Sequence, residues 1–378
     1  MTSIAPRSLA LLHVVDSLEF GGLERVVTDL AIAQRDVGHR VAVFSINATT
    51  GFRPTLETAG IEVLVGDKHG TLDRAVLRAL RAASVARGID VIHAHNFVPN
   101  YYAAMALTGL WRGPTLVNTC HDMGTRLSHR RLRMLFQWSL RRTARVAMVG
   151  SQVHARYTQS GMVPASRADT VLNGIPVARF HQTEARRAEA RRRLDIATDA
   201  LVVGCVGRLV GLKNHALLIE LMPALVKLAP HLHLVIVGYG ELHETLLQQA
   251  QRLGVAGHVH ITGQRSDVAD LLPAFDVFAQ PSLTEGVSIA LLEAAATGLP
   301  SLATRVGGNP EIVHDEQTGL LVPVSDAEAT LQALQRLIQD AELRNRLGQA
   351  AQRWVTAHAS TEALLKAYDR FYDKALKD

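Results

Sequence analysis

The chain has 378 residues, of which 48% are hydrophobic and 20% charged, a balance that excludes a largely disordered protein and suits two domains. Its net charge of +5 is unevenly distributed: residues 1–195 carry 26 Lys and Arg against 15 Asp and Glu, whereas residues 196–378 carry 14 against 20. The first part of the chain, at +11, therefore favours an anionic partner, and the second, at −6, does not.

Cysteine content and hydropathy indicate the compartment. Cys120 and Cys205 are too few for a disulfide framework, and no cysteine or histidine spacing is typical of a zinc site. No apolar run reaches the ~18 residues of a membrane-spanning helix. The apolar stretch near the N-terminus contains His13 and ends at Asp16, so it is interpreted as a strand rather than a secretion signal. We expect a cytoplasmic protein, with a peripheral position on the inner face of the cytoplasmic membrane left open.

From residue 9 onward, strand-like apolar runs alternate with amphipathic helical stretches such as 23–38 and 72–88. The runs of the first part are 9–15, 39–46, 61–66, 90–95, 115–121, 146–151 and 168–174. Nearly continuous apolar strands with helices between them predict a parallel sheet covered on both faces.

The pattern pauses over residues 175–200, which are rich in Arg, Ala and Glu, and then restarts. The later runs are 201–209, 232–240, 259–263, 277–282, 300–305 and 318–323. Residues 325–378 are predicted as helices only. We place the domain boundary near 175–198, with domains at 1–175 and 176–355 and a last helix at 356–378 that crosses back to the first domain.

The first glycine motif, Gly21-Gly22, directly follows the first strand and opens a helix. Glycines there let backbone N–H groups approach an anion at the helix N-terminus. The loop is not GxGxxG, which counts against a dinucleotide-dependent dehydrogenase. A tight turn between strand and helix explains these glycines equally well.

A second motif, residues 206–214 (VGRLVGLKN), follows a strand in the acidic part of the chain. Arg208 and Lys213 lie five positions apart on a glycine-flanked loop and can hold both phosphates of a diphosphate, Arg208 as a fork and Lys213 as a point charge. An ordinary solvated loop is the alternative.

The third motif carries two carboxylates, Glu285 and Glu293, after the strand run 277–282. Eight positions at ~100° per residue do not share one helix face, so we expect Glu285 on the loop and Glu293 at least one turn into the helix. The helix N-terminus near residues 286–288 would present free amides to phosphate. Carboxylates accept paired hydrogen bonds from sugar hydroxyls, so Glu293 suits a ribose and Glu285 a hexose. A surface or helix-dipole glutamate is the alternative.

Together these motifs resemble the GT4 family of retaining glycosyltransferases. The resemblance covers the whole chain and includes residues 173–174 (NG), 237–241 (VGYGE), 295–300 (AATGLP) and 307–311 (GGNPE). It implies an α/β protein with the GT-B fold, in which two doubly wound Rossmann-like parallel-sheet domains face a central cleft. Domain 1–175 would lie on the acceptor side and domain 176–355 would bind the nucleotide sugar. The opening HVVDSLEFGGLERVV also resembles sugar transferases of exopolysaccharide and exosortase-associated gene clusters.

The resemblance assigns roles to the site residues. Arg208 and Lys213 would neutralise the donor diphosphate, Glu293 would bind the ribose and Glu285 would contact the transferred sugar. His121 would lie by the anomeric carbon, although a buried strand-end histidine is the alternative in a chain with 17 histidines. Further donor-binding candidates, through backbone amides or near the base, are Gly21, Gly22, Tyr239, Gly240, Arg265, Gly286, Val287, Ser288 and Ile289.

These roles imply a hexosyltransferase that moves a sugar from a nucleotide-diphosphate sugar to a glycan or lipid-linked acceptor, in the synthesis of a surface polysaccharide or lipopolysaccharide. Retention without a placed protein nucleophile implies same-face attack, in which the leaving phosphate helps to deprotonate the acceptor. No DxD motif lies on a suitable loop, so we expect neither a metal nor another cofactor. A nucleotide-sugar epimerase or hydrolase on the same fold, or a non-catalytic family member, is the alternative.

A basic stretch, residues 126–145, holds seven Arg and no Asp or Glu. A basic helix with aromatic residues resembles an interfacial membrane helix or a site for an anionic acceptor; a surface helix with its apolar face in the core is an equal alternative. The candidates for acceptor or membrane contact are Asn96, Arg130, Arg131, Arg133 and Trp138. No nucleic-acid module accompanies the stretch, so nucleic acid is not an expected partner.

Two further groups have plainer interpretations. His93, His95 and Asn96 end a strand, where a structural role and a role on the acceptor side are both open. A second Arg-rich run, residues 186–193, is interpreted as a solvated helix face.

Overall fold

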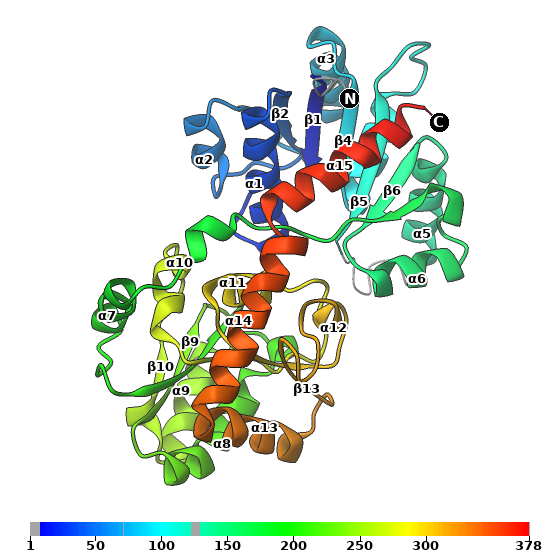
Figure 1. Cartoon of the computed structure of the whole chain (residues 1–378). Coiled ribbons are helices and arrows are strands. Elements are labelled where there is room, and N and C mark those ends of the chain that lie inside the picture. The colour runs from blue at the N-terminus through cyan, green and yellow to red at the C-terminus, as the bar shows by residue number, and fades with distance from the viewer. Residues whose placement is uncertain (1–7, 71, 122–128, 378) are drawn as a thin grey trace, which may run out of the picture. The chain divides into compact units, whose positions relative to one another are not determined.

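The computed structural model describes residues 8–70, 72–121 and 129–377. Residues 1–7 and the first three residues of the basic stretch 126–145 lie outside the described residues. The chain forms two compact units: residues 1–174 together with 361–378, and residues 175–360. Each unit is built on its own parallel sheet (Figure 1).

The first unit contains a seven-stranded parallel sheet in the order β3-β2-β1-β4-β5-β6-β7. Its strands are β1 (Ala10–Val15), β2 (Arg40–Ser45), β3 (Glu62–Val65), β4 (Val91–His95), β5 (Thr115–Cys120), β6 (Arg145–Met148) and β7 (Ala168–Thr170). Each overlaps a predicted run. The central strand β1, buried at all six positions, has the apolar sequence that a strand covered on both faces requires.

Helices cover both faces of this sheet. They are α1 (Gly22–Asp36), α2 (Arg53–Thr58), α3 (Arg74–Ala86), α4 (Phe97–Ala106), α5 (Arg130–Leu140), α6 (Ser151–Gln159) and α15 (Thr361–Ala375). Side chains alternate between the faces along each strand. On β1, Leu12 and Val14 pack toward α3 and α4, whereas Leu11 packs toward α1 and α15.

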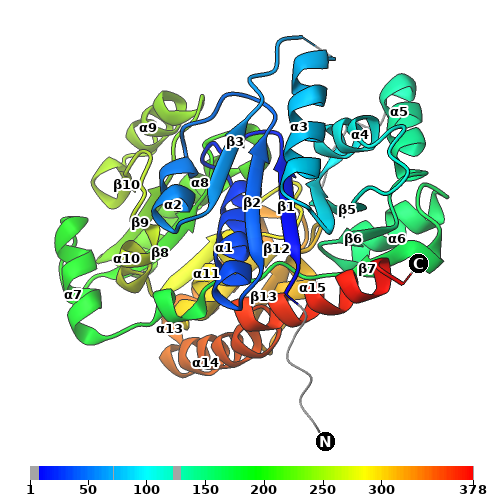
Figure 2. The ribbon, with the colours of Figure 1, turned by 90° about the horizontal axis from the view of Figure 1, so that it is seen from above.

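The last helix, α15, contributes to this first sheet although it is far from it in sequence. It lies beside α1 along one face of the sheet (Figures 1 and 2). Its apolar side is buried there through Leu364, Tyr368, Phe371 and Tyr372, in one cluster with Leu11 of β1 and Leu30 of α1. Two tyrosine hydroxyls are thereby brought beneath the sheet.

The second unit contains a six-stranded parallel sheet in the order β10-β9-β8-β11-β12-β13. Its strands are β8 (Leu201–Val206), β9 (Leu232–Val237), β10 (Val259–Ile261), β11 (Val277–Gln280), β12 (Ser301–Thr304) and β13 (Gly319–Val322). Its helices are α7 (Glu184–Arg193), α8 (His215–Leu228), α9 (His243–Arg252), α10 (Val268–Leu271), α11 (Ile289–Thr297), α12 (Asn309–Ile312), α13 (Ala327–Gln339) and α14 (Ala341–His358). Both sheets are doubly wound α/β, as predicted.

The interpretation of residues 186–193 as a solvated helix face is wrong. These residues belong to α7, where Arg191 is only 2% exposed and donates to Asp276 at 3.0 Å. Arg187 donates to the other carboxylate oxygen of Asp276 at 2.6 Å. The Arg191 guanidinium also donates to the backbone carbonyls of Ala274, Ala197 and Thr198. A buried charge is tolerated here because carboxylate and carbonyl oxygens replace its water shell.

The described residues include no helix that combines the length and apolarity needed to cross a membrane.

Candidate functional site

The motifs of the second unit meet at the carboxyl edge of its sheet. The strand order changes direction between β8 and β11, which are neighbours in the sheet although β9 and β10 lie between them in sequence. Ligands of open α/β sheets bind at such a switch point, outside the carboxyl ends of the strands. The loop after β8 carries Arg208 and Lys213, and the loop after β11 carries Glu285. A backbone hydrogen bond from Leu283 to Leu212, 2.9 Å long, joins the two loops.

Lys213 and Glu285 form an ion pair at this edge. The ammonium Nζ of Lys213 lies 2.5 Å from Oε1 of Glu285. The Lys213 side chain is 23% exposed and that of Glu285 is 8% exposed, so the lysine reaches from the surface onto a largely buried carboxylate. An ammonium has three donors, and one of them is used here.

Glu285 is held by more than the lysine. The same oxygen, Oε1, accepts from Nε2 of Gln280 at 2.6 Å and from Oγ of Ser282 at 2.7 Å. Gln280 is the last residue of β11, so the sheet itself places these donors. Three donors on one oxygen suit an ionised carboxylate better than any neutral side chain.

Paired glycines allow the loops to pack this closely. Gly307 has a φ of +51°, and a Cβ there would overlap the carbonyl oxygen of Glu285. Gly308 donates its backbone N–H to the carbonyl of Gly286 at 2.7 Å. The loop after β9 does the same for the loop after β8: a Cβ on Gly238 would overlap the carbonyl oxygen of Gly207. The GGNPE and VGYGE motifs are therefore backbone supports for the loops that carry Glu285 and Arg208.

The N-terminus of α11 follows directly. Ser288 is its N-cap, and its Oγ accepts from the backbone N–H of Leu291 at 3.3 Å. Gly286 and Val287 precede the cap and Ile289 begins the helix, so their amides lie beside Glu285 in sequence at the positive end of the helix dipole. Glu293 is the fifth residue of α11, one turn inside the helix and partly buried. The predicted division, Glu285 on the loop and Glu293 in the helix, is confirmed.

The other donor-side candidates lie on the neighbouring loops. Arg208 is exposed, and Tyr239 is 65% exposed on the loop after β9, beside Gly240. Arg265 follows β10, and its guanidinium makes two hydrogen bonds to Asp267, of 2.8 and 2.7 Å. That pairing lowers the pKa of Asp267 and occupies one edge of the Arg265 fork.

Sequence reasoning missed His215, the first residue of α8. It is 2% exposed, and neither of its ring nitrogens has a partner among the described residues. Burial, and next the nearby Lys213, lower its pKa to about 4, so the ring is neutral at pH 7. Its Nε2 would lie 3.7 Å from a Cβ on Gly207, which places the ring under the Arg208–Lys213 loop. Its position two residues after Lys213 was the available signal.

In the first unit the switch point lies between β1 and β4. Gly21, with φ of −165°, is the N-cap of α1, and Gly22 begins the helix, so this loop is the predicted turn from strand to helix. Asn96 follows β4 with a φ of +67°, and its Oδ1 accepts from the backbone N–H of His121 at 2.8 Å. The Asn96 side chain therefore supports the strand end that carries His121.

His121 ends a chain of buried histidines on β1, β4 and β5. Its Nε2 lies 3.1 Å from Nδ1 of His95, whose Nε2 lies 3.0 Å from Nδ1 of His13. His93 is bonded separately, by Nδ1 to the Tyr372 hydroxyl at 2.8 Å and by Nε2 to Oγ1 of Thr119 at 2.7 Å. Burial lowers the pKa of all four rings, that of His13 to about 4 and that of His121 to about 3. The structure thus places His93 and His95 inside the sheet layer.

The basic stretch forms α5, whose two sides differ. Phe136 and Leu140 are buried against the core, which meets the expectation of a surface helix with an apolar inner face. The outer face carries Arg130, Arg131 and Arg133, all exposed, with Met134 59% exposed and Trp138 37% exposed. Cations and large apolar side chains therefore share one exposed surface.

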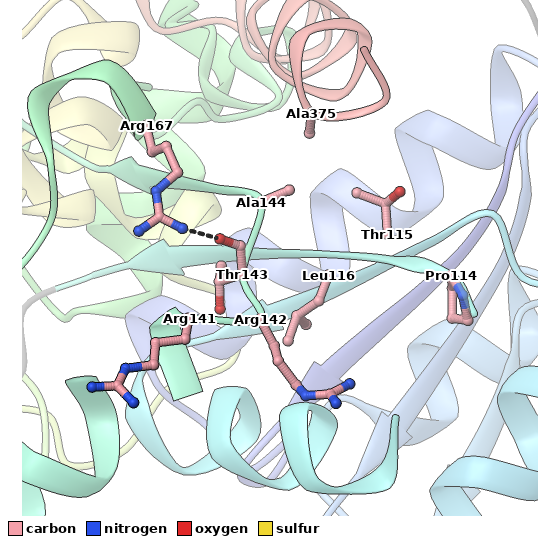
Figure 3. A pocket seen from close by; sticks show the side chains of 9 residues that line it. All are labelled: Pro114, Thr115, Leu116, Arg141, Arg142, Thr143, Ala144, Arg167 and Ala375. Carbon is pink, nitrogen blue, oxygen red and sulfur yellow. Dashed lines mark hydrogen bonds between the residues drawn. The ribbon is translucent and has the colours of Figure 1, made fainter. Parts of the chain in front are cut away.

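A cavity of about 360 Å³ lies elsewhere in this unit, at the amino end of β5 (Figure 3). Its lining residues are Pro114, Thr115, Leu116, Arg141, Arg142, Thr143, Ala144, Arg167 and Ala375. Arg167 donates to the carbonyls of Thr143 and Leu140 at 3.1 and 3.3 Å, and Arg142 donates to that of Leu107 at 3.2 Å. These arginines bind carbonyls at the C-terminal ends of α4 and α5 and in the turn after α5, at the opposite edge of the sheet from His121.

Two family models match the chain in succession: Glycosyltransferase Family 4 over residues 20–179 and Glycosyl transferases group 1 over residues 186–354. The lipopolysaccharide core biosynthesis glycosyltransferase LpsE of Rhizobium meliloti is 29% identical over 357 residues, which cover 92% of this chain and 94% of LpsE. A GDP-mannose-dependent alpha-(1-6)-phosphatidylinositol monomannoside mannosyltransferase of Mycobacterium tuberculosis is 36% identical over 223 residues. That match covers 56% of this chain and 57% of the mannosyltransferase, little more than half of each.

Among solved structures, Anabaena HepE in complex with UDP superimposes with a TM-score of 0.85 at 22% identity, covering 97% of this chain and 100% of that chain. Two successive Rossmann-like parallel-sheet units and this match define the fold class as GT-B. The chain belongs to the glycosyltransferases, as the two successive family models, over residues 20–179 and 186–354, together show.

Proposed function

We propose that this protein is a retaining glycosyltransferase that moves a sugar from a nucleotide-diphosphate sugar to a glycan or lipid-linked acceptor in the synthesis of a cell-surface polysaccharide. The observation that carries the proposal is the Lys213–Glu285 pair at the switch point of the second sheet, next to the N-terminus of α11. Cations and free helix amides meet there, as a departing diphosphate requires.

The donor diphosphate would be bound by charge and by backbone. Arg208 offers a fork for one phosphate, and Lys213 offers the donors that Glu285 leaves unused. The amides of Val287, Ser288 and Ile289 add the positive end of the α11 dipole. Glu293, one turn into α11, is placed to accept from ribose hydroxyls.

The same groups would lower the barrier for transfer. As the bond from the anomeric carbon to the diphosphate breaks, negative charge grows on the phosphate oxygens, where Arg208 and Lys213 stabilise it. The leaving phosphate would accept the proton of the attacking hydroxyl on the same face, which retains the anomeric configuration. Oε1 of Glu285 is already bound to Lys213, Gln280 and Ser282. These contacts support a role for Glu285 in orienting Lys213 rather than as a covalent nucleophile.

We further propose that transfer needs no divalent metal or other cofactor. The support is the local charge: Arg208, Lys213 and the α11 amides supply at the diphosphate what a metal ion supplies elsewhere. A requirement for added Mg²⁺ or Mn²⁺ in transfer assays would contradict this.

For the acceptor we propose a lipid-linked or phosphate-bearing glycan at the inner face of the cytoplasmic membrane. The names of relatives mention a lipopolysaccharide core, a phosphatidylinositol monomannoside and a diphosphoundecaprenol. The outer face of α5, with Arg130, Arg131, Arg133 and Trp138, has the composition of a surface that contacts anionic lipid.

The test is a panel of UDP, GDP and ADP sugars, each with and without a lipid-sugar extract and without added metal. We expect nucleoside diphosphate release to depend on one donor and to rise with the acceptor extract, and the product to be identified by mass. Equal release without any acceptor would favour a hydrolase, and an epimerised donor seen by NMR would favour an epimerase. Neither release nor a changed donor, for any sugar, would favour a non-catalytic family member.

Two variants connect the activity to the site. Lys213→Met should abolish most release and weaken nucleoside diphosphate binding measured by calorimetry, because it removes a cation from the phosphate position. Lys227→Met is the matched control, since Lys227 is an exposed lysine of α8 in the same unit. Equal effects of the two substitutions would contradict the phosphate assignment.

A further inference from the structure

The buried polar groups beneath the first sheet form one continuous hydrogen-bonded chain that begins in α15 and ends at His121. Nε2 of Gln34 in α1 donates to the Tyr372 hydroxyl at 3.0 Å, and Oε1 of Gln34 lies 2.7 Å from Nε2 of His13. From His13 the chain continues to His95 at 3.0 Å and to His121 at 3.1 Å. Gln34, His13, His95 and Tyr372 are each 2% exposed or less.

Once the donor and the acceptor of one hydrogen bond in this series are known, those of every other hydrogen bond follow. A neutral imidazole has one N–H donor and one acceptor nitrogen, and burial keeps these rings neutral by lowering the pKa of each. Because the Gln34 amide nitrogen donates to Tyr372, its oxygen must accept from His13 Nε2–H. Nδ1 of His13 is then an acceptor and binds His95 Nε2–H, and Nδ1 of His95 in turn binds His121 Nε2–H.

The consequence appears at the last atom. His121 carries its proton on Nε2, so Nδ1 holds a lone pair and no proton. That nitrogen is buried and has no hydrogen-bond partner among the described residues. A buried acceptor without a hydrogen bond destabilises the protein. We therefore expect Nδ1 of His121 to accept from a donor outside the described part of the chain.

We propose that Gln34, His13 and His95 are positioning residues that fix His121 in the Nε2–H tautomer, so that its Nδ1 accepts a hydrogen bond from a hydroxyl of the bound substrate. The substrate role rests on the proposed function; the tautomer does not. His121 then orients a hydroxyl without removing its proton, because a ring that stays neutral far below pH 7 is a weak base. The C-terminal helix takes part through Tyr372.

The neighbouring His93 closes the network consistently. The Tyr372 hydroxyl accepts from Gln34 and therefore donates to Nδ1 of His93, whose Nε2–H donates to Oγ1 of Thr119. Turning the Gln34 amide over would reverse every donor and leave an N–H at His121 Nδ1. His13, His93 and His95 also have ring nitrogens within 4.8 Å of one another, a spacing that a metal ion could use. The hydrogen bonds just described already occupy both nitrogens of each ring.

The tautomer can be read by NMR on the full chain, labelled with ¹⁵N-histidine and free of substrate, since long-range ¹H–¹⁵N spectra separate the two neutral forms. The His121 signals are assigned by their loss in His121→Gln. We expect the Nε2–H form in the wild type, unchanged by a chelator. Gln34→Met should convert part of it to the Nδ1–H form, whereas Tyr368→Phe, which leaves the bonds of Gln34 and His13 in place, should keep the Nε2–H form. A wild-type Nδ1–H form, no change in Gln34→Met, or a chelator-dependent spectrum would overturn the proposal.

Two tyrosines of α15 give a matched pair for activity. Tyr372→Phe removes the hydroxyl that accepts from the Gln34 amide, whereas Tyr368→Phe removes an equally buried hydroxyl that bonds Thr119. We expect turnover to fall by at least about tenfold in Tyr372→Phe and Gln34→Met, since a wrong imidazole tautomer disables sites that depend on it. Tyr368→Phe should stay close to the wild type. If the spectra behave as expected but turnover does not change, the substrate role of His121 is overturned and only the fixed tautomer stands. If the wild type shows no transferase activity, the spectra still decide whether Gln34 fixes the tautomer.

Discussion

At the scale of single residues, the candidate donor site depends on atoms that approach one another too closely for ordinary side chains. Gly307 and Gly308 lie against the backbone of Glu285 and Gly286. The position of the Glu285 carboxylate, and through it of Lys213, is therefore set by a loop more than twenty residues further along the chain.

Gly307→Ala tests this support. The new Cβ would overlap the carbonyl oxygen of Glu285 and would also sit at a φ of +51°, so the loop must move. We expect a loss of about 2–4 kcal/mol in the free energy of unfolding, measured with urea, together with a loss of turnover. Gly254→Ala is the control: its φ is +67°, but nothing lies within 4 Å of its Cβ, so only the backbone strain of about 1 kcal/mol is added. Similar losses in both variants would show that the close approach does not matter.

Glu285→Gln separates the charge of Glu285 from its shape. The amide oxygen is a poorer acceptor for three converging donors, and the Lys213 site changes from a neutral pair to a net positive charge. We expect turnover to fall by about 100-fold, while nucleoside diphosphate affinity holds or rises. Turnover comes from the release assay and affinity from calorimetry, with Glu220→Gln as an exposed control in the same unit. A parallel loss of affinity would make Glu285 a simple structural support.

At the scale of elements, α7 and α5 show why charge runs are hard to interpret from sequence. Both are rich in arginine, yet α7 inserts Arg191 onto Asp276, whereas α5 turns Arg130, Arg131 and Arg133 to solvent. The difference depends on a carboxylate 85 residues away that the pattern of α7 itself does not contain.

Arg191→Met should therefore be the most costly substitution in α7. It removes a buried guanidinium and leaves Asp276 bonded to Arg187 and to the backbone of Val202. We expect a loss of about 3 kcal/mol in the free energy of unfolding, because breaking a buried pair leaves an imperfectly compensated charge. Arg192→Met, at a side chain that is 74% exposed, should cost less than about 0.5 kcal/mol. Equal costs would restore the interpretation of α7 as a solvated face.

The outer face of α5 should bind anionic membranes. Replacing Arg130, Arg131 and Arg133 by Glu should abolish co-sedimentation with vesicles that contain phosphatidylglycerol, since each basic residue near such a surface contributes about 1 kcal/mol. The same replacement of Arg74, Arg78 and Arg112 changes the net charge equally from exposed positions of the same unit. If both triple variants lose binding alike, net charge and not α5 is responsible.

At the scale of the whole molecule, the periodicity of the sequence predicted both sheets, because buried parallel strands need apolar runs of four to eight residues wherever they occur. It also placed Glu285 on a loop and Glu293 in a helix, since eight positions cannot share one helix face. The histidine chain could not be predicted, because it depends on the register that sets His13 opposite His93 across β1 and β4. Nor could the contact of Tyr372 with Gln34, which lies 338 residues away in sequence.

The same histidines make the stability of the first unit depend on pH. Burial lowers the pKa of His13 to about 4 and of His121 to about 3, and it holds those of His93 and His95 well below 6.5. As pH falls below about 6.5 the unfolded chain binds protons that the folded unit does not. The free energy of unfolding therefore decreases. Each such histidine lowers the free energy of unfolding by up to about 1.4 kcal/mol per pH unit, until the pH reaches its pKa in the folded unit.

Calorimetry should therefore show that the Tm of the first unit is lower at pH 5 than at pH 7 by about 10 °C or more. Most carboxylates are still ionised in this range of pH. His13→Gln should make the dependence of Tm on pH shallower, whatever it does to Tm itself, because one proton fewer is taken up on unfolding. His69→Gln is the control, since the side chain of His69 is 82% exposed. A dependence on pH that is as steep in His13→Gln as in the wild type would mean that the buried ring is already protonated in the folded unit, and a protonated His13 could not accept from His95 or set the tautomer of His121.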